Sequence, residues 1–511
     1  MHHVTRRQVI AGLAGGAIAL QFARADARKA QQPIALLRYA GPDSGVPNPF
    51  QVSPAGPGGP ILVSLLYDTL TWKDESGIIP WLASEWSISD DGLTYTFQIE
   101  PGAAWHDGAP LTVEDVAFSF TYYSRHPYVW APSDVVQSAV VEGESVRIML
   151  KQPYAAFIED ISGIVPIIPR HVWESVDDPI AYTGTGRVMG SGPYVLAEYN
   201  ATEGAYRLIA NESYWRGTPR ITEFRQLTVP PEALIQSTLQ GEIDLASSPD
   251  ASVADILADD ERLAIHESVP LSIVRLAVNT TRPPLDRPAV RQAIAYALDR
   301  QFIAESITRG PAIVGSAGVV PPETPWFNPD LRQYAYDPDR ARELLAGERL
   351  TINLVADARA RDPDLMIPML EEVGITLNVQ RVDSPTRIQL LRDGDFQLGF
   401  VTHIGVGGDP DYLRRWYTGE ESNAFAQGSI FSNEEYTRLG EAQAASLDAT
   451  ERSDLIFRMQ EILAEELPTI VLYHRRFYWI HDPTLFTPME TWGGLMNGIP
   501  FPHNKLALIA T

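Results

Sequence analysis

A glycine-rich loop near residue 405 carries side chains that could bind a small polar molecule. Residues 403–411 read HIGVGGDPD, and Arg414 follows three residues later. The carboxylates of Asp409 and Asp411 could pair with a cation, and an arginine can hold a carboxylate through two parallel hydrogen bonds. Glycines also let the backbone approach a ligand closely. The loop is therefore a candidate binding site, although Asp409 could instead cap the following helix, with Pro410 in its first turn.

Four aromatic residues and one histidine are further candidates for this site. Trp416 and Tyr417 follow the loop, whereas Phe50 and Trp492 come from near the two ends of the chain. Aromatic side chains are common in ligand pockets because they bury a large area with little loss of entropy. His403 could contact a metal or a polar ligand, or it could serve only the structure of the strand end. We expect no bound metal and no cofactor.

The elements that precede the loop predict how it is held. The hydrophobic pattern alternates as strand 350–356, helix 363–373, strand 375–382, helix 385–393 and strand 396–402. Such alternation predicts a parallel, doubly wound α/β layer with helices outside. In layers of this kind ligands bind beyond the carboxyl ends of the strands, which is where the candidate loop begins.

The segment from residue 82 to 120 predicts a strand, a turn and a helix. After a turn at residues 90–92, apolar and polar residues alternate, with the apolar face made of Leu93, Tyr95, Phe97 and Ile99. Thr112 is a good helix cap, and Asp115 three residues later completes an imperfect capping box. The His106-Asp107-Gly108 stretch is predicted to be a second turn, because aspartate and glycine suit tight turns. It is not expected to bind zinc, because one histidine followed by one aspartate supplies too few ligands.

The sequence of this segment closely resembles the signature of the family-5 extracytoplasmic solute-binding proteins, the peptide, nickel and opine class of ABC importer receptors. The matching positions are Pro80, Leu82, Ala83, Trp86, Asp91, Gly92, Tyr95, Phe97, His106, Asp107, Gly108, Pro110, Leu111, Asp115 and Val116. Residues 190–196, 211–215, 234–245 and 281–300 resemble further motifs of that family. The resemblance extends from about residue 60 to 480.

The resemblance implies an α/β, two-lobed periplasmic-binding-protein fold of type II with an extra subdomain. The ligand cleft would lie between two lobes joined by two crossing segments, near Asn279 and near Tyr473–Tyr478. The implied divisions are lobe I at 28–62, 188–278 and 478–511, the extra subdomain at 63–187, and lobe II at 279–477. Binding would close the lobes about this hinge without catalysis.

The implied function is the periplasmic substrate-binding component of an ABC importer, which delivers a peptide or peptide-sized polar solute to the membrane permease. In peptide-binding relatives an aspartate before the Asp-Pro motif pairs with the α-ammonium of the peptide, and here Val406 takes that position. Nickel-binding relatives carry a histidine after Asp-Pro, where this chain has Asp411. An opine or a sugar conjugate is therefore an alternative ligand. A ligand sensor for a chemoreceptor or sensor kinase, and a periplasmic hydrolase, are alternative functions.

The first 27 residues look like an export signal. Arg6 and Arg7 precede an apolar stretch, as in twin-arginine signals, and small residues predict cleavage near Ala25 or Ala27. An ordinary secretory signal is the alternative. We expect a periplasmic protein without a lipid anchor, because the chain has no cysteine to carry one.

Composition limits the remaining classes of function. The 511 residues suggest two or three domains, and the absence of cysteine excludes disulfides, thiolate metal sites and cysteine nucleophiles. A formal net charge of −25 disfavours partners with phosphate backbones, so no nucleic-acid partner is expected. We also expect no membrane insertion of the mature chain and a monomeric state.

Overall fold

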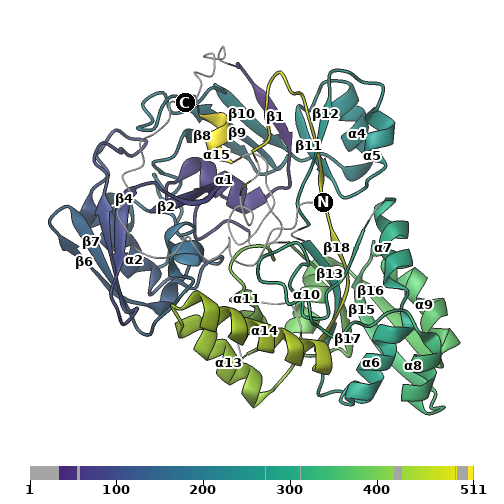
Figure 1. The fold of residues 1–511 in the computed structure, drawn as a ribbon. Helices are drawn as coiled ribbons and strands as arrows, with labels where there is room; N and C mark the ends of the chain where they lie inside the picture. Colours follow the sequence, from purple (N-terminus) through teal and green to yellow (C-terminus); the bar gives the residue numbers. More distant parts are fainter. Residues whose placement is uncertain are drawn as a thin grey trace, which may run out of the picture.

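The structure is a computed structural model of the chain. It describes residues 34–53, 58–270, 272–310, 312–404, 406–418, 429–489, 491 and 504–509. The described strands form sheets of seven, six, four and two strands. Figure 1 shows the seven-stranded sheet at the top, the four-stranded sheet at the left and the six-stranded sheet at the lower right.

The seven-stranded sheet has the order β12-β19-β11-β1-β10-β9-β8. Its strands are β1 (Leu37–Ala40), β8 (Tyr194–Asn200), β9 (Ala205–Ala210), β10 (Glu223–Leu227), β11 (Leu245–Ser248), β12 (Ala264–Glu267) and β19 (Tyr478–His481). The short helices in the same stretches of chain are α1 (Gly58–Leu66), α4 (Pro231–Leu239), α5 (Val253–Leu257) and α15 (Lys505–Leu508). The central β1 runs parallel to both β10 and β11. The sheet therefore joins three separate parts of the chain.

The four-stranded sheet is antiparallel throughout, in the order β4-β5-β7-β6. Its strands are β4 (Ala83–Ile88), β5 (Thr94–Ile99), β6 (Val136–Glu142) and β7 (Ser145–Leu150), and a small hairpin of β2 (Thr71–Asp74) and β3 (Gly77–Pro80) precedes it. The helical segments are α2 (Val113–Tyr123), η2 (Ser133–Val135), η3 (Phe157–Ser162) and α3 (Arg170–Trp173). All of them fall between residues 71 and 173.

The local predictions for this region are confirmed. Tyr95 and Phe97 of β5 are fully buried on one face, as the alternation required. Gly92 has a φ of +68°, a left-handed conformation that favours glycine in the turn before β5. At the start of α2 the Asp115 carboxylate accepts the backbone N–H of Thr112 at 2.9 Å, which is half of a capping box.

The six-stranded sheet has the order β14-β18-β13-β17-β15-β16. Its strands are β13 (Ser272–Val278), β14 (Ile313–Val314), β15 (Leu350–Asp357), β16 (Ile375–Val382), β17 (Leu398–Ile404) and β18 (Thr469–Arg475). Its helices are α6 (Pro288–Ala297), α7 (Arg300–Thr308), α8 (Pro338–Leu345), α9 (Asp362–Glu372), α10 (Ser384–Arg392), α11 (Tyr412–Tyr417), α13 (Glu434–Ala445) and α14 (Ala449–Glu466). β15 runs parallel to β16 and β17, which confirms the predicted parallel layer.

The other half of this sheet is antiparallel. β13, which the sequence division placed in lobe I, lies between β17 and β18 and pairs with both. All seven residues of β13 are buried. The sequence of a fully buried strand does not show which sheet the strand joins, and the division of the chain into lobes stays a prediction.

Two chain crossings link the seven-stranded and six-stranded sheets side by side. One leads from β12 to β13 and the other from β18 to β19, and β12 pairs with β19 just as β13 pairs with β18. The backbone N–H of Ser268 donates to the Phe477 carbonyl at 2.9 Å, and the N–H of Phe477 donates to Ser268 Oγ at 2.9 Å. These bonds tie the two crossings together, so both can bend as one hinge.

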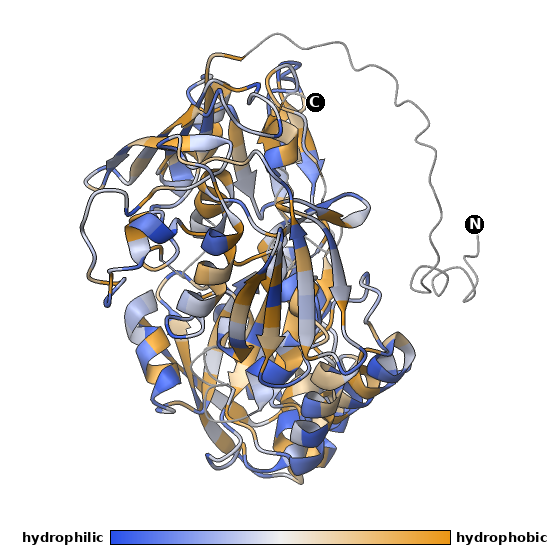
Figure 2. Cartoon of the chain, turned by 90° about the vertical axis from the view of Figure 1, so that its left-hand side faces the viewer, coloured by the Kyte–Doolittle hydropathy of each residue, from blue (hydrophilic) through white to orange (hydrophobic). Residues whose placement is uncertain are grey.

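Buried apolar side chains form separate cores on the two sides of the crossings. One core includes Leu37, Phe97 and Phe224, and another includes Leu276, Leu354 and Leu398. Figure 2 shows hydrophobic residues along the strands and mixed faces on the helices at the lower edge, the pattern of helices that cover a core on one side. Among the described helices, none is long and apolar enough to cross a membrane.

Candidate functional site

The candidate loop lies where the sequence predicted, at the carboxyl end of β17. β17 is hydrogen-bonded to β13 on one side and to the parallel strand β15 on the other. The chain then passes from Val406 to Asp411 and enters α11. The position fits the general rule for α/β sheets, but the contacts of the individual side chains decide what the loop can do.

Asp409 is held in a buried ion pair with Arg452 of α14. Arg452 Nη1 and Nη2 donate to the two carboxylate oxygens, each at 2.6 Å, and both residues are almost fully buried. Burial raises the pKa of Asp409, and the charge of Arg452 opposes that rise. The same carboxylate accepts the backbone N–H of Asp411 at 2.9 Å. Asp409 therefore shapes the turn before α11 and is already neutralised by an arginine.

Asp411 is fully buried and saturated with donors. Arg414 donates to it from Nε at 2.8 Å and from Nη2 at 2.6 Å, and Gln443 Nε2 of α13 donates at 2.6 Å. The guanidinium that we expected to hold a ligand carboxylate is thus paired within its own helix. Arg414 and Asp411 together form a rigid, neutral corner at the start of α11.

The loop also contacts the region of the four-stranded sheet. The hydroxyl of Tyr154 lies 3.0 Å from Asp411 Oδ2 and 3.1 Å from Asp160 Oδ2. Close by, the backbone N–H of Ala155 donates to the Ala444 carbonyl of α13 at 2.7 Å. Figure 1 shows α13 and α14 beside the sheet of β4 to β7. These contacts join segments far apart in the sequence into one buried polar cluster.

Sequence reasoning missed Tyr154 and Asp160. The signal that was available is the stretch from Phe157 to Ile161, in which two acidic residues interrupt an apolar run. The segment forms η3, and Asp160 points into the interior with 4% of its surface exposed. A buried carboxyl in an otherwise apolar run is costly unless it has partners, and is therefore worth marking.

His403 is a half-buried, neutral side chain beside Trp416. The two rings meet edge to face at 4.5 Å between centroids, and the Arg275 guanidinium lies 5.2 Å from the Trp416 ring on another side. Burial lowers the pKa of His403 to about 3, and the charges of Arg275 and Arg415 add to this. A histidine in this setting has no tendency to carry a positive charge, so its part in the site is that of a neutral ring.

Val406, Trp416 and Tyr417 belong to one apolar cluster beneath the loop. Each is about 1% exposed, and they pack with Ile273 of β13. Val406 fits this cluster as an apolar side chain, whereas a carboxylate in its place would have to give up its hydration at a cost in free energy. Within the described residues, no group of three or more histidine, cysteine, aspartate or glutamate side chains is arranged to hold a metal.

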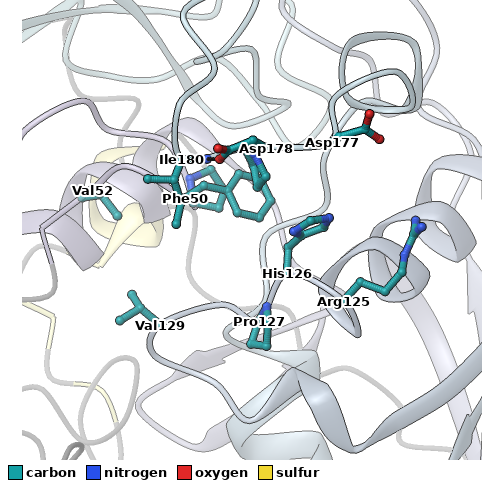
Figure 3. Close-up of a pocket in the computed structure, with 11 residues that line it drawn as sticks. Phe50, Val52, Arg125, His126, Pro127, Val129, Asp177, Asp178 and Ile180 are labelled. Carbon is teal, nitrogen blue, oxygen red and sulfur yellow. Dashed lines mark hydrogen bonds between the residues drawn. The ribbon is translucent and has the colours of Figure 1, made fainter.

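Phe50 lies in a different place, at the wall of a cavity of about 630 Å³. Its ring packs on Tyr122, Tyr123 and Trp173, with centroids 5.6, 5.4 and 4.9 Å away. Figure 3 shows Phe50 and Ile180 on one side of the cavity, with Val52 and Val129 bounding it elsewhere. The volume is in the range of small-molecule pockets. Phe50 therefore lies apart from the loop residues, although the sequence analysis named it as a candidate for the same site.

The rim of this cavity carries charges of both signs. Arg125 and His126 follow α2, and Asp177 and Asp178 belong to the facing segment (Figure 3). The Gln51 side chain fixes that segment by donating to the carbonyl of Tyr182 at 2.6 Å and of Ile180 at 2.9 Å. The cavity thus has an apolar wall and a polar rim. Such a cavity suits a small molecule that carries an apolar group next to a polar one.

Three predicted residues cannot be placed. Arg6 and Arg7 of the expected export signal lie outside the described residues, as does Trp492. Among the other candidates, the structure brings together His403, Val406, Asp409, Asp411, Arg414, Trp416 and Tyr417, and it places Phe50 in another core.

Comparison with known proteins gives a family and a fold. The family model of bacterial extracellular solute-binding proteins, family 5 (middle), matches residues 77–425. The chain is 26% identical to heme-binding protein A of Haemophilus influenzae over 440 residues, which cover 79% of this chain and 80% of that protein. It is also 26% identical to the dipeptide-binding protein of Escherichia coli over 441 residues, covering 78% and 81%.

Solved structures agree with the predicted fold class. DppA of Helicobacter pylori in complex with the peptide STSA superposes with a TM-score of 0.79 at 20% identity, covering 94% of this chain and 99% of that one. NikA of Brucella suis in complex with Fe(III)-EDTA also gives 0.79, at 22% identity and with coverage of 91% and 99%. The predicted two-lobed α/β periplasmic-binding-protein fold is confirmed.

Proposed function

This chain belongs to the bacterial extracellular solute-binding proteins of family 5, and from that membership we propose that it captures a peptide or a peptide-sized polar solute between two closing lobes. The captured solute is then delivered to the permease of an ABC importer. The chain needs no catalytic step for this work, because a ligand that contacts both lobes only when they are closed is sufficient to shift the hinge.

The observation that carries the proposal is the pair of crossings together with the contacts between the lobes. We divide the lobes by their sheets: the seven-stranded sheet with the four-stranded subdomain on one side, and the six-stranded sheet on the other. The first crossing then lies just before β13. Tyr154 and Ala155 of the subdomain touch Asp411 and Ala444 across the division. An arrangement joined by one hinge and a few polar contacts suits reversible closure.

The loop chemistry favours a ligand that is not clamped by a free carboxylate. Val406 stands where the family resemblance places the amine-binding aspartate, and it is buried among apolar groups. Asp409 and Asp411 are each neutralised by an arginine. Relatives with the names quoted above bind ligands as different as dipeptides and heme. Because a dipeptide-binding protein is among these relatives, we propose peptides first. Because the loop offers no free carboxylate clamp, opines or sugar conjugates are the alternative class.

A thermal-shift screen of the mature protein tests the proposal. The compounds are di- to hexapeptides, opines, sugars and nickel–histidine, because ligand at 100 times its Kd adds about 2.7 kcal/mol to the native state. A rise in Tm with free peptides supports the peptide proposal, and a rise with opines or sugars alone changes the ligand class. No rise with any compound contradicts it. Mass spectrometry of the incubated peptides should find them intact, since cleavage would indicate a hydrolase.

We further propose that the chain is exported to the periplasm through the twin-arginine pathway. The support is the Arg6-Arg7 pair before an apolar stretch. The double change Arg6→Lys and Arg7→Lys should abolish periplasmic accumulation, measured by fractionation and immunoblotting of cells that express the full chain. Normal accumulation of this variant would assign export to the general secretory route.

A further inference from the structure

One tyrosine hydroxyl connects two carboxyl groups at the contact between the lobes. Tyr154 reaches Asp411 Oδ2 at 3.0 Å and Asp160 Oδ2 at 3.1 Å, and all three side chains are buried. A phenol has one proton and can donate only one hydrogen bond. The second of these contacts therefore needs a proton that comes from a carboxyl group.

The proton must reside on Asp160. Asp411 is bound by both the Nε and the Nη2 of Arg414 and by Gln443, so it is the ionised partner and accepts the proton of Tyr154. Within the described residues, no lysine or arginine forms an ion pair with Asp160, and its side chain is hydrogen-bonded to Tyr154 alone. A protonated Asp160 donates to the oxygen of Tyr154, and both contacts become hydrogen bonds.

The charged groups around Asp160 agree with this placement. On its own side of the contact, Glu159 adds a second negative charge, which Lys73 binds at 2.7 Å. Burial raises the pKa of Asp160 well above its ordinary value, and the charges of Asp409 and Glu159 add to the rise.

From the other lobe, Asp411 also favours the protonated form of Asp160, whereas Arg415 favours its ionised form. The two remaining arginines of the cluster, Arg414 and Arg452, are each engaged with another carboxylate. Within the described residues, Asp409 and Asp411 each accept hydrogen bonds from a guanidinium, whereas Asp160 accepts none. A proton on Asp160 removes a buried charge that has no hydrogen-bonded cation.

We propose that Asp160 and Tyr154 form a proton-dependent latch, in which closure of the lobes takes up one proton at Asp160. The proposal rests on the lobe closure proposed above. When the lobes separate, Asp160 loses the neighbouring aspartates of the other lobe and gains water, so its proton is released. The latch thereby makes closure, and with it ligand affinity, stronger in acid than at alkaline pH.

The sign follows from the linkage between proton binding and conformation. A carboxyl whose pKa is raised in the closed form stabilises that form fully below the pKa of the open form, which for an aspartate is near 3.9. The stabilisation is lost as pH rises through the higher pKa of the closed form. Between these limits the ratio of closed to open molecules should fall by up to about tenfold per pH unit.

A distance measurement on the ligand-free full chain tests the latch. The chain has no cysteine, so Glu144→Cys on the subdomain and Glu441→Cys on α13 allow two spin labels to be attached specifically. Double electron–electron resonance from pH 4 to pH 8 then reports the closed and open populations. We expect the short distance to dominate in acid and to lose population as pH rises. A distribution that does not change with pH, whether short or long, overturns the proposal.

Two variants separate the latch from a general effect of acid. Asp160→Asn keeps a neutral donor toward Tyr154 and should remove the pH dependence while the short distance persists at pH 8. Tyr154→Phe removes the bridge and should lower the closed population at pH 4. Asp90→Asn, an exposed carboxyl of the same subdomain, should behave as the parent chain. An unchanged pH slope in Asp160→Asn overturns the proposal, and because no ligand is used, failure here leaves the proposed ligand class to its own test.

Discussion

Two buried aspartates in this chain meet opposite surroundings. Asp68, between α1 and β2, accepts hydrogen bonds from Lys505 Nζ at 2.9 Å, from Trp81 Nε1 at 2.7 Å and from the Tyr214 hydroxyl at 2.8 Å. Asp160, at the contact between the lobes, meets one hydroxyl and faces other carboxylates. Burial disfavours the ionised form of both. Lys505 and the donors outweigh burial at Asp68 and lower its pKa, whereas at Asp160 the neighbouring acids raise it further.

The difference separates a fixed junction from a movable contact. Asp68 joins the seven-stranded region to the chain's C-terminal helix α15, and none of its partners needs to leave when the lobes move. Asp160 shares the Tyr154 hydroxyl with Asp411, which lies on the other side of the hinge. A saturated ion pair holds one geometry, while an acid with one shared proton can gain or lose its contact at low cost.

The first way to break this comparison is to neutralise Asp68. Asp68→Asn leaves Lys505 charged in a site where the side chain has no exposed surface. Removing one partner of a buried ion pair typically costs about 3–5 kcal/mol, and we expect the upper part of that range, because four aromatic or hydroxyl donors also lose a charged acceptor. Urea unfolding followed by circular dichroism measures the loss.

A double variant is the control for this prediction. Asp68→Asn with Lys505→Met removes both charges and should recover a large part of the stability lost by the single change, because no charge remains buried alone. If the double variant is as unstable as Asp68→Asn, the charge of Lys505 is not the cause and the contrast with Asp160 loses its basis.

The second test concerns Asp409, which resembles Asp68 in having a cation but lies at the lobe contact. Asp409→Ala leaves Arg452 without its bidentate partner, so we expect a loss of about 3 kcal/mol in stability. It should also weaken ligand binding more than Asp107→Ala, which removes an exposed turn carboxylate. Unfolding curves and calorimetric titration with a ligand from the screen measure the two effects. Equal affinities in the two variants would contradict our placement of the binding site.

The third test reverses the sign of the first. Asp160→Asn should leave stability near neutral pH unchanged or slightly higher, because the native contact already holds a neutral side chain. The parent chain should gain stability relative to this variant as pH falls, since the raised pKa of Asp160 stabilises the folded state in acid by up to about 1.4 kcal/mol per pH unit. Unfolding curves at several pH values check this. A loss at pH 7 as large as that of Asp68→Asn would place Asp160 in the class of fixed junctions.

The sequence was most informative where motifs describe the scaffold. Ser191 of the G-S-G-P-Y motif and Tyr214 and Trp215 of the N-E-S-Y-W motif all donate to Asp68, as does Trp81, which lies between the signature positions Pro80 and Leu82. Motifs of this kind encode a buried hydrogen-bond network, which requires fixed residue types at fixed places. That is why the resemblance of these motifs to a known family could predict the fold.

The same scaffold explains the His106 turn. His106 Nε2 lies 3.1 Å from the Gly192 carbonyl, and its backbone N–H donates to the Gly190 carbonyl at 2.9 Å. The prediction of a structural turn agrees with these contacts.

The candidate site was less predictable because its chemistry depends on pairs that are distant in the sequence. The sequence around Asp409 does not predict its ion pair with Arg452, which lies 43 residues later. The sequence around Asp411 likewise does not predict its hydrogen bond with Tyr154, which lies 257 residues earlier. A loop sequence shows which side chains are available for a ligand. Only the folded chain shows which of them are already occupied.

The smallest expected effect concerns His403, which is half-buried and for which the described residues show no carboxylate partner. Burial and the charges of two arginines lower its pKa to about 3, so it should stay neutral at every pH above about 4. Its ring-proton chemical shift, assigned by comparison with a His403→Gln variant, should therefore remain constant between pH 5 and pH 8. The ring-proton signal of the exposed His171, with 45% of its side chain accessible, serves as the comparison. A titration midpoint for His403 inside that range would mean that its ring can become positively charged beneath the loop. Burial alone would then not explain why this ring is neutral while the aspartates beside it are ion-paired.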